Sequence, residues 1–118
     1  GRKVAARLQI PAAVLCADSS IITTNDKAAT WKSPVQVPGA IAINFARDGY
    51  IVATANQNEC VGIQTLELKG TNVGSPSTCL EAGIKEGTVA VAHTSGSVLV
   101  WSDDIFATSP DGGDTWQS

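Results

Sequence analysis

The sequence lacks several features that would point to particular functions. It has no Met, no pattern of helical period, and no apolar run near the ~20 residues that a membrane-spanning helix needs. Its 8 Lys and Arg residues are outnumbered by 11 Asp and Glu residues and form no cluster that could neutralise nucleic-acid phosphates. We therefore expect no membrane span and no nucleic-acid partner. Because the chain starts without Met, Gly1 is expected to be a processed end, an engineered boundary or the start of an excised piece.

Cysteine and histidine are also scarce. The chain has 3 Cys and 1 His, with no C-x-x-C spacing and no second histidine near His93, so we expect no metal site and no cofactor. Cys60 and Cys79 flank the Gly- and Ser-rich stretch 70–78 and could close it as a disulfide in a secreted protein. Cys16 lies in an apolar run and is expected to be a buried free thiol.

The sequence is rich in short β-strands. Runs of Val, Ile, Thr and aromatic residues are separated by turn signals such as Arg47-Asp-Gly49 and Glu86-Gly87. The strands expected most clearly are 40–45, 50–54, 62–68, 88–93, 97–101 and 105–108. Only 79–83 could form a short helical turn. This pattern predicts an all-β chain, whose fold could be a sandwich, a barrel or part of a propeller.

Internal repetition favours the propeller. A shift of 85 residues aligns 12–32 with 97–117 without a gap, and pairs Thr30 and Trp31 with Thr115 and Trp116. A shift of 48 residues aligns 39–43 with 87–91. Two repeats of about 43–48 residues fit the interval of 85, and this period is typical of four-stranded propeller blades. We expect a single propeller segment over 1–118 with about two and a half to three antiparallel blades, at approximately 3–37, 38–80 and 81–118.

The clearest motif is an eight-residue turn present in both copies of the longer repeat. Residues 109–116 read Ser-Pro-Asp-Gly-Gly-Asp-Thr-Trp, which resembles the Asp-box, or bacterial neuraminidase repeat, at every defined position of Ser-x-Asp-x-Gly-x-Thr-Trp. The copy at 24–31 has Thr in place of Ser, and Ala28 in place of Gly. The resemblance implies a structural turn between the third and fourth strands of a blade. Its residues are Thr24, Asp26, Thr30, Trp31, Ser109, Asp111, Gly113, Thr115 and Trp116.

Physical chemistry supports a structural role for this turn. An Asp in a tight turn can accept hydrogen bonds from backbone N–H groups a few residues later, as we expect of Asp26 and Asp111. Gly112 and Gly113 can supply positive φ where the chain reverses. We expect both Trp31 and Trp116 to be mostly buried between blades.

The Asp-box resemblance implies a non-catalytic binding or scaffold module, with a glycan or a protein as ligand, in a secreted or cell-surface protein. The alternative is part of a sialidase-like glycoside hydrolase, because the family includes sialidases and Arg7-Leu-Gln-Ile-Pro11 partly resembles the Arg-Ile-Pro segment with which they begin. Such an enzyme needs three arginines that hold a carboxylate, a Tyr/Glu nucleophile pair and an acidic Asp. Here Arg2, Arg7 and Arg47 are the only arginines, and Tyr50 is expected to pack within a strand. We therefore identify no catalytic residues.

Three other features have simple interpretations. His93 ends a strand that could approach a central channel, although a lone histidine there is usually solvated or hydrogen-bonded. Trp101 is most simply a core residue, and Asp103-Asp104 a solvated turn.

Three blades are fewer than a closed ring requires. The remaining blades are expected to come from the rest of a parent chain or from a second copy. The strand expected at 3–10 would be the inner strand of the first blade or, in the second case, would complete the third blade of its partner.

Overall fold

The structure, a computed structural model, describes residues 3–6, 12–16, 18–24, 31, 33–46, 49–81, 89–94, 97–102 and 106–117. Within these ranges every regular element is a β-strand and every strand pairing is antiparallel. The prediction of an all-β chain is confirmed. All six of the most clearly expected strands are present, with ends within two residues of the predicted ones.

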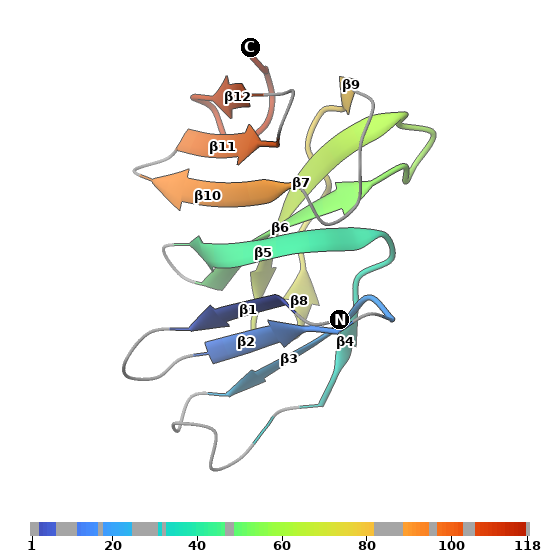
Figure 1. Cartoon of the computed structure of the whole chain (residues 1–118), viewed down its shortest axis with the longest axis vertical. Coiled ribbons are helices and arrows are strands. Elements are labelled where there is room, and N and C mark those ends of the chain that lie inside the picture. The colour runs from blue at the N-terminus through green and yellow to red at the C-terminus, as the bar shows by residue number, and fades with distance from the viewer. Residues whose placement is uncertain are drawn as a thin grey trace.

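The strands form three sheets, here called A, B and C in chain order. Sheet A contains β1 (Lys3–Ala6), β2 (Ala12–Leu15), β3 (Ser20–Thr24) and β4 (Val35–Gln36). Sheet B contains β5 (Ala40–Ala46), β6 (Gly49–Ala55), β7 (Gly62–Lys69) and β8 (Asn72–Val73), and β9 (Leu80–Glu81) also pairs with β7. Sheet C contains β10 (Ala90–Thr94), β11 (Ser97–Trp101) and β12 (Phe106–Ser109). The sheets follow one another along the longest axis of the molecule, from A at the bottom to C at the top (Figure 1).

Sheet B is covered on both faces. Because successive side chains of a strand point to opposite faces, β6 directs Tyr50 and Val52 to one side and Ile51 and Ala53 to the other. The first pair belongs to a core shared with sheet A, which includes Leu15 and Ile21 of that sheet. The second pair belongs to a core shared with sheet C, whose members there include Val91, Val98 and Val100. The three sheets therefore pack face to face through two separate cores.

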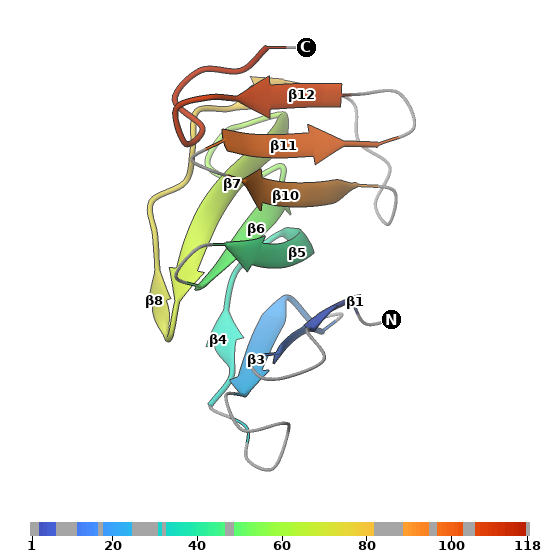
Figure 2. The same cartoon turned by 90° about the vertical axis from the view of Figure 1, so that its left-hand side faces the viewer.

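The first strands of the three sheets lie together. β5 lies between β1 and β10, as both views of the molecule show (Figures 1 and 2). The side-chain amide of Asn44 in β5 donates a hydrogen bond of 3.1 Å to the backbone carbonyl of Val91 in β10. This bond joins sheets B and C directly.

The two copies of the 85-residue repeat differ by one residue in strand register. Ala13 pairs with Thr23, whereas Val98, its counterpart 85 residues later, pairs with Ser109 and not with Thr108. A shift of one residue moves a strand's side chains to the opposite face. Ile21 is accordingly fully buried, while its sequence counterpart Phe106 is 58% exposed. The ungapped alignment therefore does not hold at the level of the sheets.

Of two local expectations, one is wrong and one is confirmed. Leu80 and Glu81 form β9, which pairs with Ile63 and Gly62, so the described part of 79–83 is extended and not helical. The described part of the strand expected at 3–10 is β1, and it pairs with β2 of its own sheet. This pairing confirms the expectation that 3–10 supplies the first strand of the first sheet.

Candidate functional site

Asp111 organises the turn at 109–116, which follows β12. Its Oδ1 accepts the backbone N–H of Thr115 at 2.9 Å and the hydroxyl of Ser109 at 2.7 Å, and its Oδ2 accepts the Thr115 hydroxyl at 2.7 Å. Together these bonds lower the pKa of Asp111 to about 2, and the bond from the Thr115 hydroxyl contributes most to the shift. Both carboxylate oxygens are thus used within the turn.

Gly113 occupies a position that only glycine fits. Its φ is 103°, a conformation that side-chain-bearing residues rarely adopt, and its N–H donates to the Ser109 hydroxyl at 2.7 Å. A Cβ at Gly113 would lie 2.5 Å from the Cβ of Ser77. The turn therefore approaches segment 74–79, which follows β8 of sheet B.

Two hydrogen bonds join the turn to this segment. The N–H of Thr78 donates to the carbonyl of Gly113 at 3.0 Å, and the indole N–H of Trp116 donates to the carbonyl of Thr78 at 2.8 Å. The Trp116 ring packs against the core between sheets B and C. After the turn, Gln117 pairs with Thr108 of β12 through two backbone hydrogen bonds of 2.8 Å, so residues 109–116 form a hairpin turn.

Segment 74–79 is itself attached to sheet B. Cys60 and Cys79 form a disulfide across 19 residues of sequence. The N–H of Ser77 donates to the Thr65 carbonyl at 2.7 Å, and the Ser77 hydroxyl accepts the N–H of Thr65 at 2.9 Å. The segment thus connects β7 of sheet B to the hairpin turn of sheet C.

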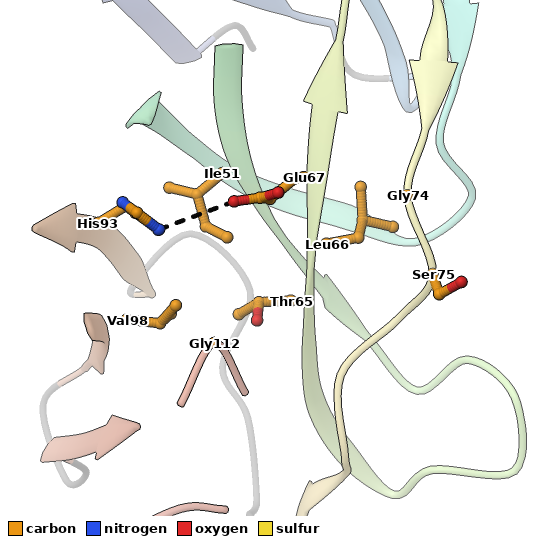
Figure 3. A pocket seen from close by; sticks show the side chains of 9 residues that line it. All are labelled: Ile51, Thr65, Leu66, Glu67, Gly74, Ser75, His93, Val98 and Gly112. Carbon is orange, nitrogen blue, oxygen red and sulfur yellow. Dashed lines mark ion pairs between the residues drawn. The ribbon is translucent and has the colours of Figure 1, made fainter. Parts of the chain in front are cut away.

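A pocket of about 140 Å³ opens between sheets B and C beside the turn (Figure 3). Glu67 of β7 and His93 of β10 both line it and point toward each other, with 3.7 Å between Oε1 and Nε2. Ile51 and Val98 provide apolar walls, and Thr65 and Gly112 line the side nearest the turn. The pocket thus combines two titratable groups, a hydroxyl and aliphatic surface.

The two titratable groups differ in their surroundings. The side chain of His93 is 13% exposed, whereas that of Glu67 is 47% exposed. The second carboxylate oxygen of Glu67 lies 3.8 Å from the ammonium of Lys69, so a cation already offsets the charge of Glu67. Both separations exceed the hydrogen-bond limit of about 3.5 Å, so hydrogen-bonding capacity remains on each side chain.

The sequence analysis singled out His93 as a solvated or hydrogen-bonded strand end that could approach a central channel, and the structure places it in the lining of this pocket. The alternation along β10 directs Val91 and His93 to the same side, toward sheet B, because each pairs with a buried valine of β11. Thr65 and Glu67 were missed. The available signal was the alternation of Ile63, Thr65 and Glu67 along β7, which places these three side chains on one face.

The tryptophans are more exposed than expected. Trp31 is 43% exposed and Trp101 is 38% exposed, so Trp31 is not a fully packed ring and Trp101 is not a core residue. Trp101 pairs with the exposed Phe106 on the face of sheet C that points away from sheet B. Trp116 is the most buried of the three rings.

Other predicted residues have varied outcomes. Tyr50 is buried and its ring lies 5.6 Å from that of Phe45, in keeping with a packing role. Thr24 is fully buried in β3, and Cys16 is free but only partly buried. Several singled-out residues lie outside the described residues: Arg2, Arg7, Asp26, Ala28, Thr30, Arg47, Asp103 and Asp104.

Among the residues that the structure describes, no group of three or more His, Cys, Asp or Glu side chains could hold a metal ion. The same residues contain no helix long and apolar enough to cross a membrane. No protein-family model, curated protein or solved structure significantly matches this chain.

Proposed function

We propose that this chain is part of an Asp-box β-propeller and serves as a non-catalytic binding or scaffold module whose ligand is a glycan or a protein. The observation that carries the proposal is the hairpin turn at 109–116. It has the Asp-box sequence, and both carboxylate oxygens of its Asp111 accept hydrogen bonds within the turn. Its Trp116 donates a hydrogen bond to Thr78, which joins sheet C to the segment attached to sheet B.

The arrangement of the sheets supports the propeller. Each sheet is a series of antiparallel strands in chain order, with its first strand beside the first strand of the next sheet. Propeller blades pack face to face with their first strands innermost, whereas a barrel would close one sheet on itself. The ranges 3–36, 40–81 and 90–117 would then be successive blades.

The outer face of sheet C supports a further packing partner. Trp101 and Phe106 lie opposite each other there, and a contiguous exposed apolar face marks a surface that another element covers. In this molecule each covered face of sheet B packs against another antiparallel sheet. The occupant we propose is accordingly a further blade, supplied by a parent chain or by a second copy.

The chemistry of the described residues supports binding more than sialoside hydrolysis. Asp111 is held by the turn, and Tyr50 is a buried residue packed on Phe45, so neither faces the pocket. The pocket offers hydrogen-bonding groups and aliphatic walls, which suit recognition of a ligand. The disulfide is compatible with an exported protein.

Two assays on the same sample test the proposal. The chain is applied to an array of neutral and sialylated glycans, and to immobilised extracts of surface proteins, while a fluorogenic sialoside reports hydrolysis. We expect saturable binding to a glycan or a protein and no hydrolysis above the rate without protein. Turnover of the sialoside that scales with protein concentration would contradict the proposal and favour the sialidase-like alternative.

A further inference from the structure

We propose that the pocket lined by Glu67 and His93 is a binding site for a single neutral pyranose ring. The inference rests on the proposed binding function and deepens it by assigning both a location and a ligand class. It is argued from the geometry, charge and size of the pocket.

The spacing of the two side chains favours a hydroxyl-bearing ligand. Glu67 Oε1 and His93 Nε2 are 3.7 Å apart, too far for a direct hydrogen bond but close enough for one hydroxyl to contact both. A hydroxyl donates to a carboxylate and accepts from an imidazole N–H, or donates to an unprotonated nitrogen. Within the described part of the chain, the polar contacts of these two side chains are their mutual approach at 3.7 Å and that of Lys69 to Glu67 at 3.8 Å, both longer than a hydrogen bond.

The charge of the site favours a neutral ligand. An anionic sugar would be repelled by the carboxylate of Glu67, which lines the pocket. A cationic ligand would compete with Lys69, whose ammonium lies 3.8 Å from the other oxygen of Glu67. A neutral polyol avoids both costs.

The size and walls of the pocket fit one sugar ring. Its volume is about 140 Å³, similar to the cavity of about 150 Å³ that holds benzene, a six-membered ring without substituents. Ile51 and Val98 present aliphatic surface to the C–H groups of such a ring, while Thr65 adds a hydroxyl at the side nearest Gly112 (Figure 3). Few contacts are available to so small a ligand, so we expect dissociation constants in the millimolar range.

The test is a titration of the ¹⁵N-labelled chain, followed by amide chemical shifts. The probes are the methyl glycosides of glucose, galactose and mannose, with N-acetylneuraminic acid as the anionic comparison. We expect at least one methyl glycoside to shift the amides of Glu67 and His93 with millimolar affinity, and the anionic sugar to bind more weakly. Glu67→Gln should weaken that binding by about tenfold or more, because it replaces a charged acceptor by a neutral amide.

Glu81→Gln is the matched control, since Glu81 is exposed on β9 and pairs with the opposite end of β7. It should leave the affinity unchanged, and both variants should keep the remaining amide shifts of the folded chain. No shift at Glu67 and His93 with tens of millimolar of each glycoside would overturn the pocket assignment. So would equal binding by the natural chain and Glu67→Gln. In either case sugar binding elsewhere on the chain, or capture of a protein, would leave the proposed binding function standing.

Discussion

The indole N–H of Trp116 donates a hydrogen bond of 2.8 Å to the backbone carbonyl of Thr78. Trp116 closes the hairpin turn of sheet C, and Thr78 precedes the disulfide-bonded Cys79 in the segment attached to sheet B. One hydrogen bond therefore joins the turn at 109–116 to the residue next to the Cys60–Cys79 disulfide.

Trp116→Phe tests this contact. The substitution keeps an aromatic ring against the core but removes the indole donor, so we expect a loss of about 1 kcal/mol in the free energy of unfolding. Urea denaturation followed by circular dichroism measures the change. Trp101→Phe is the control, because Trp101 is partly exposed on the outer face of sheet C, and it should cost much less. Equal effects of the two substitutions would contradict the assigned role of Trp116.

Gly113→Ala should destabilise the turn strongly. The new Cβ would require a rare φ of 103° and would lie 2.5 Å from the Cβ of Ser77, so we expect a loss of about 2–4 kcal/mol in the free energy of unfolding. Gly70→Ala is the matched control, since Gly70 also has positive φ but has no atom within 4 Å of the built Cβ. A cost at Gly113 no larger than that at Gly70 would show that the turn does not approach segment 74–79.

The double substitution Cys60→Ala/Cys79→Ala should cost about 3 kcal/mol, the loop-closure entropy expected for a crosslink across 19 residues. Cys16→Ala, which removes the free and partly buried thiol, should have a small effect. Thiol titration of the unfolded chain should give one free thiol before reduction and three after it. Three free thiols before reduction would exclude the crosslink.

The lowered pKa of Asp111 predicts an acid-dependent contribution of the turn to stability. Because the pKa falls from 3.8 to about 2 on folding, the contribution is fully present above the unfolded value and is lost as the pH falls through about 2. Asp111→Asn should flatten the pH dependence of the melting temperature in that window. The pKa of Asp18 is also lowered, mainly by the side-chain hydrogen bond from Ser20 and then by the backbone bond from the same residue. Because Asp18 is present in both chains, the difference between the curves of Asp111→Asn and the natural chain reports the contribution of Asp111. Identical curves for Asp111→Asn and the natural chain would contradict this account.

The strands could be predicted because strand formation depends mainly on the composition of the local sequence. In β6 and β7, Val, Ile and Thr recur between turn residues, and this composition favours strands whatever the sheets pack against. The turn at 109–116 was also identifiable, because glycine and aspartate positions in tight turns follow from backbone geometry.

Contacts between sheets could not be predicted in the same way. The one-residue difference in register between β2–β3 and β11–β12 is set by packing, and an ungapped alignment conceals it. The pocket was missed for a similar reason. Glu67 and His93 are far apart in sequence, and only the packing of sheet B on sheet C brings their side chains together.

A crystal structure of this chain soaked with a methyl glycoside tests the central claim most directly, because it reports the stacking of the sheets and the ligand site together. We predict three face-packed antiparallel sheets, with the turn at 109–116 bonded to Thr78 and one sugar ring in the pocket, a hydroxyl of which contacts both Glu67 and His93. A single closed barrel, or a turn remote from segment 74–79, would contradict the propeller account. A sugar bound elsewhere, with the same stacked sheets, would contradict the pocket assignment alone.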